Sequence, residues 1–280
     1  MQLYKVSFFD IRIIKRFLEI LGVVASIISI LLFCVDIPPT CKSILGITTC
    51  TLLVVVYIGI FAWANRLRKV EISVEGSSII VKEGDIFDEE GFKAIAFNEY
   101  FDTQVDDKII SSSSLNGIFI NKYFPLSAES LDNHIAQYPF ADHEFLELNE
   151  GRRYGKKQKY SIGTVCVYDE FLLAAFTKFD DKNRAYLTMP DYLTFLNKFW
   201  DNVNTVYSQK SVSVPVFGSG ITRIKEHRGI EDEDLLKIML WTFKISETRF
   251  KYPAKLTIVI HKDKMRKVNL FDILSIKNGL

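Results

Sequence analysis

Two uncharged apolar runs near the N-terminus constrain this 280-residue chain more than any other feature. Ile20–Val35 contains 16 residues without a charge, and Ile44–Ala64 contains 21. At ~1.5 Å per residue, helices of these lengths would span about 24 and 31 Å, close to the thickness of a bilayer's hydrocarbon core. Pro38 interrupts any continuous helix between them. The sequence therefore predicts a transmembrane helical hairpin over residues 1–69, with spans at about 18–35 and 44–64.

The charges are divided unevenly along the chain and predict how the hairpin is oriented. The formal net charge is only +1, but the first 70 residues hold eight basic and three acidic residues and the remainder carries −4. Basic residues precede the first span and follow the second, whereas the connecting loop has only Lys42. The positive-inside rule then predicts a multi-pass protein with both termini in the cytoplasm. The outer flanks hold Lys5, Arg12, Lys15, Arg16, Arg66, Arg68 and Lys69.

Two other interpretations of the apolar runs remain open. A cleaved signal peptide has a shorter apolar core and is not followed at once by a second span. A buried helical hairpin of a soluble protein is possible, although 21 uncharged residues are rare in that role. Hydroxyl side chains such as Ser26 and Thr48 either bond back to their own helix or line a helix interface or pore. We favour the bilayer and the local hydroxyl bonds.

Residues 70–280 alternate between strand and helix patterns, which predicts a single α/β domain. The run at 256–260 is apolar without alternation, as in strands covered on both faces. Thr188, Pro190 and Asp191 are typical of a helix start. Strands are expected at 70–75, 78–82, 93–97, 163–168, 171–179, 211–217 and 255–261, and helices at 128–137 with Ser127 as cap, from 188 onward, at 231–243 and at 268–276.

Two strand ends carry residues suited to a ligand. Gly84, Asp85 and Ile86 follow the second strand, and Gly218-Ser219-Gly220 follows the strand near 211–217. Ligands of open α/β sheets bind beyond the carboxyl ends of strands, and closely spaced glycines leave room for phosphate oxygens. The glycines could equally form an ordinary tight turn. Neither a P-loop nor a dinucleotide-binding fingerprint is present, a serine-hydrolase elbow lacks its first glycine, and the cysteines and histidines show no metal spacing.

Taken in order, these motifs resemble a known family. The strand followed by Gly84-Asp85-Ile86, Asn98 after the next strand, and the late Pro-x-φ-Gly-x-Gly-Ile pattern at 215–221 resemble the macrodomain. That resemblance implies a mixed sheet between helices, in a three-layer α/β/α domain that binds ADP-ribose. The stretches NEYFDT, SLNGIFI and VPVFGSGITRI, together with the hairpin, are more similar to the Thoeris antiphage effectors that join two transmembrane helices to a macrodomain.

The resemblance also implies roles for individual residues. Asp85, beside Ile86, would accept a hydrogen bond from the adenine amino group, because a carboxylate only accepts. His261, or a neighbour at the end of the last strand, would border the adenine. Asn98 and Asp102 would face the distal ribose or a group attached to it. Backbone N–H groups of Gly218, Ser219, Gly220, Ile221 and Thr222 would contact the pyrophosphate. Arg223 would add a charge-assisted contact or would simply be a surface charge. The opposite wall would hold Ser113, Leu115, Asn116 and Gly117.

Three functions follow in order of preference. The first is an effector in the bacterial inner membrane, active in antiviral defence. It would sense an NAD-derived ADP-ribose signal such as histidine-ADP-ribose, made by a TIR-domain partner, then oligomerise and disrupt the membrane in abortive infection. The second is a membrane-tethered ADP-ribosyl hydrolase, which is disfavoured because the run after Asn98 lacks the glycines of hydrolysing macrodomains. The third is a membrane-anchored scaffold. No catalytic residue, metal, cofactor or nucleic-acid partner is expected.

Overall fold

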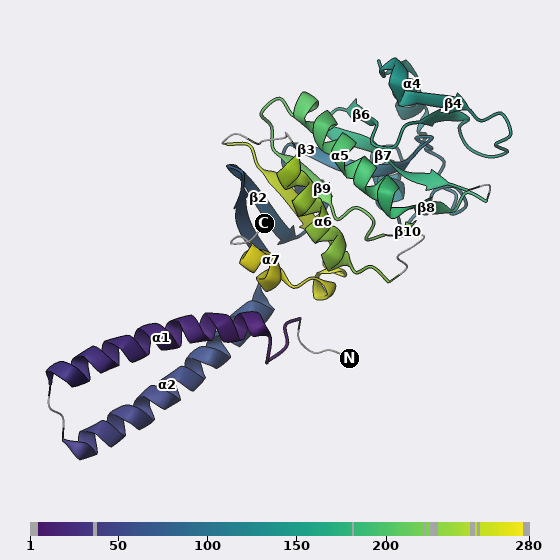
Figure 1. The fold of residues 1–280 in the computed structure, drawn as a ribbon. Helices are drawn as coiled ribbons and strands as arrows, with labels where there is room; N and C mark the ends of the chain where they lie inside the picture. The colour runs from purple at the N-terminus through teal and green to yellow at the C-terminus, as the bar shows by residue number, and fades with distance from the viewer. Residues whose placement is uncertain are drawn as a thin grey trace. The chain divides into compact units, whose positions relative to one another are not determined.

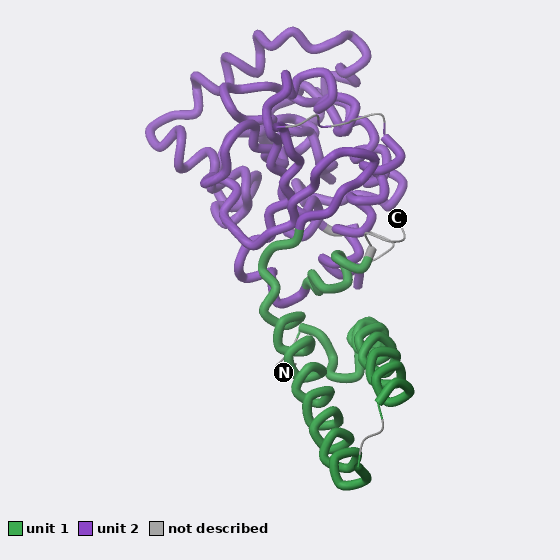
Figure 2. Tube along the Cα trace, turned by 90° about the vertical axis from the view of Figure 1, so that its left-hand side faces the viewer, with its two compact units in different colours: residues 1–70, 268–279 green, residues 71–267, 280 purple. Residues whose placement is uncertain are grey.

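A computed structural model of the chain describes residues 5–35, 38–180, 182–220, 222–224, 229–246, 250 and 253–276. These residues form two compact units, coloured separately in Figure 2. Unit 1 contains residues 1–70 and 268–279, and unit 2 contains residues 71–267. The predicted boundary after residue 69 puts residues 268–279 in the second domain, whereas they belong to unit 1 here. That predicted domain boundary stays a prediction.

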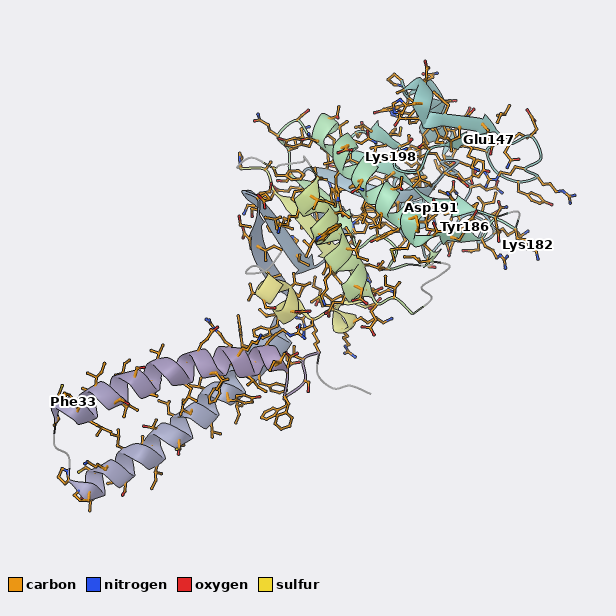
Figure 3. The ribbon with its side chains drawn as sticks, viewed as in Figure 1. Phe33, Glu147, Lys182, Tyr186, Asp191 and Lys198 are labelled. Carbon is orange, nitrogen blue, oxygen red and sulfur yellow. The ribbon has the colours of Figure 1, made fainter. Side chains whose placement is uncertain are left out.

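Unit 1 contains two long apolar helices. Helix α1 runs over Ile11–Cys34 and α2 over Pro39–Arg66 (Figure 1). The Asp10 carboxylate caps α1 by accepting from the backbone N–H of Arg12 at 2.9 Å. Both helices are long and apolar enough to cross a membrane, and their most apolar windows are not buried inside the protein. Phe33, near the end of α1, is 93% exposed (Figure 3).

Hydroxyl groups along the hairpin bond to their own helices. Ser26 Oγ donates to the Gly22 carbonyl at 2.8 Å, and Thr48 Oγ1 donates to the Ile44 carbonyl at 2.7 Å. These are the local i to i−4 bonds that the sequence favoured. The hydrogen-bonding needs of these two hydroxyl groups are therefore met within their own helices.

A C-terminal helix, α7 (Leu270–Ile276), belongs to the same unit as the hairpin. Its Phe271 is buried in a cluster with Val6, Ile13 and Ala64, and its ring lies 5.7 Å from that of Trp63. Its Asp272 forms an ion pair with Arg12 of α1. Residues from the two ends of the sequence thus pack together around the base of the hairpin.

Unit 2 is built on one mixed sheet, which confirms the predicted sheet type. The strand order is β1-β2-β11-β9-β3-β7-β8-β10, and β6 also pairs with β7. The pairs from β2 through β11, β9 and β3 to β7 are parallel, whereas β6 and β8 run antiparallel to β7. The strands are β1 (Lys69–Val74), β2 (Ser77–Glu83), β3 (Phe92–Asn98), β6 (Val165–Tyr168), β7 (Phe171–Phe179), β8 (Ala185–Leu187), β9 (Val212–Pro215), β10 (Arg223–Ile224) and β11 (Leu256–Ile260).

Helices cover both faces of the sheet, so the predicted three-layer α/β/α fold is confirmed. On β7, Phe171 and Leu173 join the core formed with α3 (Leu115–Tyr123) and α4 (Glu129–Gln137). On the alternate side of the same strand, Phe176 lies 4.7 Å from Phe195. Strand side chains alternate between faces, so β7 separates two apolar layers. The second layer is formed by α5 (Met189–Val206) and α6 (Asp232–Ile245) (Figure 1).

Local sequence signals explain most element boundaries. The Thr188 hydroxyl and the Asp191 carboxylate form a reciprocal capping box at the start of α5, as the sequence predicted. The predicted cap of α4 was wrong by one residue, because the N-cap is Ala128; Ser127 still accepts from the Glu129 N–H at 3.2 Å. A separate two-stranded sheet, β4 (Phe145–Leu148) with β5 (Gln158–Tyr160), was not predicted.

Candidate functional site

Two cavities with a common wall form a cleft at the carboxyl ends of the parallel strands. The proximal cavity, of about 360 Å³, contains Asp85 and His261. The distal cavity, of about 200 Å³, contains Asn98 and Thr177. The cleft places both predicted strand ends in one site, as expected for an open α/β sheet. The residues that line both cavities are Ser113, Leu115, Pro215, Val216, Ser219 and Gly220.

Strand register brings the two sides of the proximal cavity together. β2 and β11 are parallel neighbours, and Glu83 pairs with Ile260. The residues that follow, Asp85 and His261, therefore emerge at the same edge of the sheet. Asp85 is exposed, and its Oδ1 accepts from the Phe87 N–H at 3.0 Å. That bond fixes the carboxylate at the cavity mouth while leaving acceptor capacity for a ligand donor.

A glycine loop after β9 forms the wall between the two cavities. Gly218 has φ +85°, a conformation that favours glycine. The fully buried Tyr192 anchors the start of this loop, because its hydroxyl donates to the Phe217 carbonyl at 3.0 Å. Burial raises the pKa of Tyr192, so the phenol stays protonated and remains a donor. Lys264 Nζ donates to the Ser219 carbonyl at 2.7 Å and also lies 3.9 Å from the Asp232 carboxylate, which offsets its positive charge.

Helix α3 begins at the opposite wall. The Ser114 hydroxyl caps it by accepting from the Gly117 N–H at 3.2 Å. A Cβ on Gly117 would lie 2.1 Å from the backbone oxygen of Ser111. Only glycine fits this close approach, so Gly117 positions the wall formed by Leu115 and Asn116 and does not itself line either cavity.

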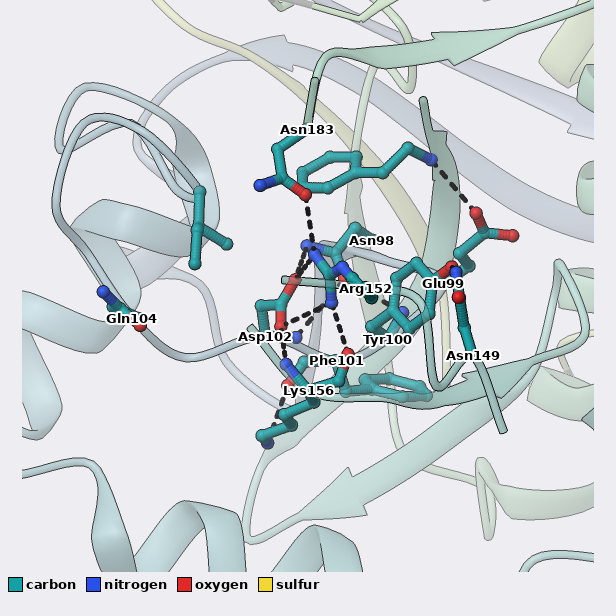
Figure 4. Close-up of polar contacts among 12 residues, drawn as sticks. Asn98, Glu99, Tyr100, Phe101, Asp102, Gln104, Asn149, Arg152, Lys156 and Asn183 are labelled. Carbon is teal, nitrogen blue, oxygen red and sulfur yellow. Dashed lines mark hydrogen bonds and ion pairs between the residues drawn. The ribbon is translucent and has the colours of Figure 1, made fainter. Parts of the chain in front are cut away.

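Asn98 and Asp102 stabilise the loop that follows β3 (Figure 4). Asn98 Oδ1 accepts from the Tyr100 N–H, and its amide donates to Asp102 Oδ2, both at 2.9 Å. Asp102 is fully buried and forms a two-point ion pair with Arg152, at 2.6 and 3.0 Å. It also accepts from the Lys156 N–H at 2.7 Å. Asp102 is therefore occupied within the protein and lies outside the residues that line the cleft.

Most of the predicted site residues converge. Ile221 lies outside the described residues, as does the side chain of Arg223. Asp102 and Gly117 support the site from outside its walls. The structure brings together Asp85, Ile86, Asn98, Ser113, Leu115, Asn116, Gly218, Ser219, Gly220 and Thr222.

Sequence reasoning missed several residues that line the cleft. Phe87 lies in the proximal cavity only two residues after Asp85, so its position beside the predicted turn was an available signal. Lys264 follows His261 by three residues, and its Nζ donates to the Ser219 carbonyl of the glycine loop. Thr177 and Phe179 lie at the end of β7, and no local motif marks them.

Comparison with known proteins agrees with this geometry. Residues 79–261 match the family described as Thoeris protein ThsA, Macro domain, which is more than half of the chain. The chain belongs to the ThsA macro-domain family. The Thoeris protein ThsA of Bacillus amyloliquefaciens (strain Y2) is 37% identical over 269 residues, covering 94% of this chain and 89% of that protein. The ThsA match runs from β2 to the end of β11, and these two strands carry opposite sides of the proximal cavity.

Solved macrodomain structures are more distant from this ThsA-family chain. The Oceanobacillus iheyensis macrodomain with ADP has a TM-score of 0.49 and 12% identity, covering 76% of this chain and 98% of that one. The same macrodomain with MES bound has a TM-score of 0.45 and 13% identity, covering 75% and 95%.

Proposed function

We propose that this chain is a membrane effector of bacterial antiphage defence. Its macro domain binds an NAD-derived ADP-ribose signal, such as histidine-ADP-ribose, that a TIR-domain partner makes. The hairpin spans the inner membrane with both termini in the cytoplasm. Binding of the signal drives oligomerisation, and the clustered hairpins then disrupt the membrane. Family membership supports the defence role, and the two exposed apolar helices support the membrane location.

The observation that carries the proposal is the order of groups along the cleft. Asp85 and Phe87 lie at one end, the glycine loop lies in the middle, and Asn98 lies at the other end. A carboxylate suits the adenine amino group, and an aromatic ring suits its face. Closely spaced backbone amides in a glycine loop suit a pyrophosphate. The cleft can therefore hold an elongated nucleoside diphosphate sugar such as ADP-ribose without a basic patch.

Sensing is favoured over hydrolysis by the loop after β3. A hydrolase needs a group that activates water near the distal ribose. Here the Asn98 oxygen accepts backbone N–H groups, and the Asp102 carboxylate is paired with Arg152. These side chains are committed to the loop itself. A membrane-tethered ADP-ribosyl hydrolase is the alternative, and it requires another residue to activate the water.

The chain offers two covalent routes from the cleft to the hairpin. One runs from Asp85 back through β2 and β1 to α2, and the other runs from His261 through Met265–Lys267 to α7. Because α7 packs within unit 1, a shift of the segment after β11 acts directly on that unit. A ligand can drive such a change only if it binds the active state more tightly than the resting one.

Calorimetry on the purified full chain in detergent tests the ligand. We expect ADP-ribose and histidine-ADP-ribose to bind the wild type, and Gly220→Glu to weaken both by about 100-fold, because a carboxylate would face the pyrophosphate. Gly229→Glu is the matched control, since neither glycine has a heavy atom within 4 Å of its Cβ position. Absence of binding to the wild type contradicts the proposal. Turnover of either nucleotide or of an ADP-ribosylated protein supports the hydrolase instead.

A further inference from the structure

A third cavity, of about 500 Å³, lies beside the distal end of the cleft. We call it the side cavity. Phe179 at the end of β7 lines both the distal cavity and the side cavity, so the two spaces adjoin at this residue. The Phe179 N–H donates to the buried Glu99 carboxylate at 3.0 Å, which fixes the backbone where the cavities adjoin. A group that extends from a ligand in the distal cavity past Phe179 would enter the side cavity.

Arg152 lines the side cavity, and Figure 4 shows its contacts with Asp102 and Asn183. Its guanidinium carbon lies 3.9 Å from the centroid of the Tyr100 ring, and its side chain is 6% exposed. It donates to Asp102 and also to Asn183 Oδ1 at 3.1 Å. The positive charge of Arg152 is therefore balanced by Asp102, and its orientation is fixed before any ligand arrives.

The remaining charges leave one unbalanced cation on the wall. Asp180 is paired with Arg184 at 2.7 Å. Among the residues that the structure describes, Arg153 has no hydrogen-bond or ion-pair partner, and its side chain is exposed on the cavity wall. A guanidinium presents a planar fork of N–H donors that a carboxylate can accept bidentately, and one carboxylate balances its single charge. Asn149, Tyr100 and Tyr154 also line the side cavity and can contact the polar and planar parts of a group that carries this carboxylate.

We propose that the side cavity binds a carboxylate-bearing group attached to the distal ribose of the signal, with Arg153 as its charged contact. This inference rests on the proposed function, because the nucleotide must first occupy the cleft. It assigns recognition of the conjugate to the loop around residues 149–154. The adenine and pyrophosphate contacts stay in the cleft.

Calorimetry on the full chain in detergent tests this assignment with three probes: ADP-ribose, histidine-ADP-ribose and free histidine. We expect Arg153→Gln to weaken histidine-ADP-ribose by about ten-fold, the effect of losing one charge-assisted hydrogen bond. ADP-ribose should bind the variant within about two-fold of wild type, because it lacks the carboxylate. Lys157→Gln is the matched control: it removes an exposed charge from the same loop, paired with Glu150 away from the cavity, and should change neither affinity.

The outcomes separate this inference from the proposed function. If the wild type binds neither nucleotide, the proposed function is wrong, and the inference falls with it. If the wild type binds both but Arg153→Gln weakens neither, or weakens both equally, only the side-cavity assignment is wrong. Free histidine that binds as tightly as the conjugate would show an independent amino-acid site and overturn the attachment to the distal ribose.

Discussion

The two units place the same kinds of side chain in opposite environments. In unit 2, Phe199 and Trp200 are fully buried between α5, α6 and the sheet. In unit 1, Phe33 is 93% exposed and Ile47 is 70% exposed. Unit 2 therefore stabilises itself through its own apolar core, whereas the exposed apolar surface of the hairpin is suited to a lipid environment. The two units thus differ in where their apolar side chains lie: inside unit 2, and on the outside of the hairpin in unit 1.

The two units also contain ion pairs of very different exposure. Unit 2 buries the complete ion pair of Asp102 and Arg152, whereas the Arg16–Glu19 pair of α1 is more than half exposed. A buried pair is costly to break because the remaining charge has lost its water. An exposed pair contributes little. Substitutions that exploit these differences test the comparison.

The largest effect is expected from Arg152→Ala. It leaves the fully buried Asp102 carboxylate without its partner, which costs about 3–5 kcal/mol of the free energy of unfolding. Arg184→Ala is the matched control: it removes an arginine from an ion pair with Asp180, but that side chain is 70% exposed, and the expected loss is under about 1 kcal/mol. Urea unfolding of the full chain in detergent, followed by tryptophan fluorescence, measures both. Equal losses would refute the role of burial.

The next effect concerns lipid exposure. Ile27→Arg places a charge in the middle of the first span, which costs about 2.5–3.5 kcal/mol of insertion. We expect the carbonate-resistant membrane fraction of the chain to fall. Leu126→Arg is the control: Leu126 in unit 2 is 99% exposed, and its replacement should leave that fraction unchanged. If both variants remain fully in the membrane fraction, membrane insertion of the chain does not depend on the apolar surface of the hairpin.

The sequence predicted the parts of this fold that depend on local pattern. The Thr188 capping box, the apolar β11 and the glycine loop at 218–220 are each visible within a few residues. Helix α3 was missed, because Gly117 lies in its first turn and lowers helix propensity. Its glycine is needed only because Ser111 approaches it in three dimensions.

Contacts distant in sequence account for two placements that local patterns do not reveal. Asp102 is predicted to face the ligand, and in the structure it is paired with Arg152, which lies 50 residues away. No local sequence pattern predicts the ion pair between Asp102 and Arg152. The packing of Phe271 against Ala64 likewise joins residues about 200 positions apart, so α7 could not be placed with the hairpin from sequence. Tertiary partners, not propensities, decided these cases.

A smaller effect tests whether α7 acts with the hairpin. Asp272→Asn weakens its half-buried ion pair with Arg12, at a cost of about 1 kcal/mol. We expect faster amide hydrogen exchange in α7 and at the start of α1, with unit 2 unchanged. Glu19→Gln, which breaks the exposed pair with Arg16, should leave exchange as in wild type. Faster exchange spread through unit 2 would contradict the division of the chain into two units.

The smallest effect depends on pH. Burial raises the pKa of Glu99, against weaker opposing effects of the Phe179 N–H and Lys159. The resulting stability is fully present below the ordinary pKa of glutamate and is lost as pH rises through the raised value. Glu99→Gln should therefore increase the free energy of unfolding at neutral pH relative to wild type, and less so in acid. Glu147→Gln, whose exposed carboxylate also faces Lys159, should show no such trend. A Glu99→Gln loss that is equal at every pH would contradict the burial effect.

Dye release from liposomes that contain the full chain tests most directly whether a nucleotide bound in unit 2 activates the membrane hairpin of unit 1. We predict that histidine-ADP-ribose triggers release with the wild type and with Gly229→Glu, and that Gly220→Glu stays silent. Release that is independent of the nucleotide, or that is the same in Gly220→Glu, would contradict the claim.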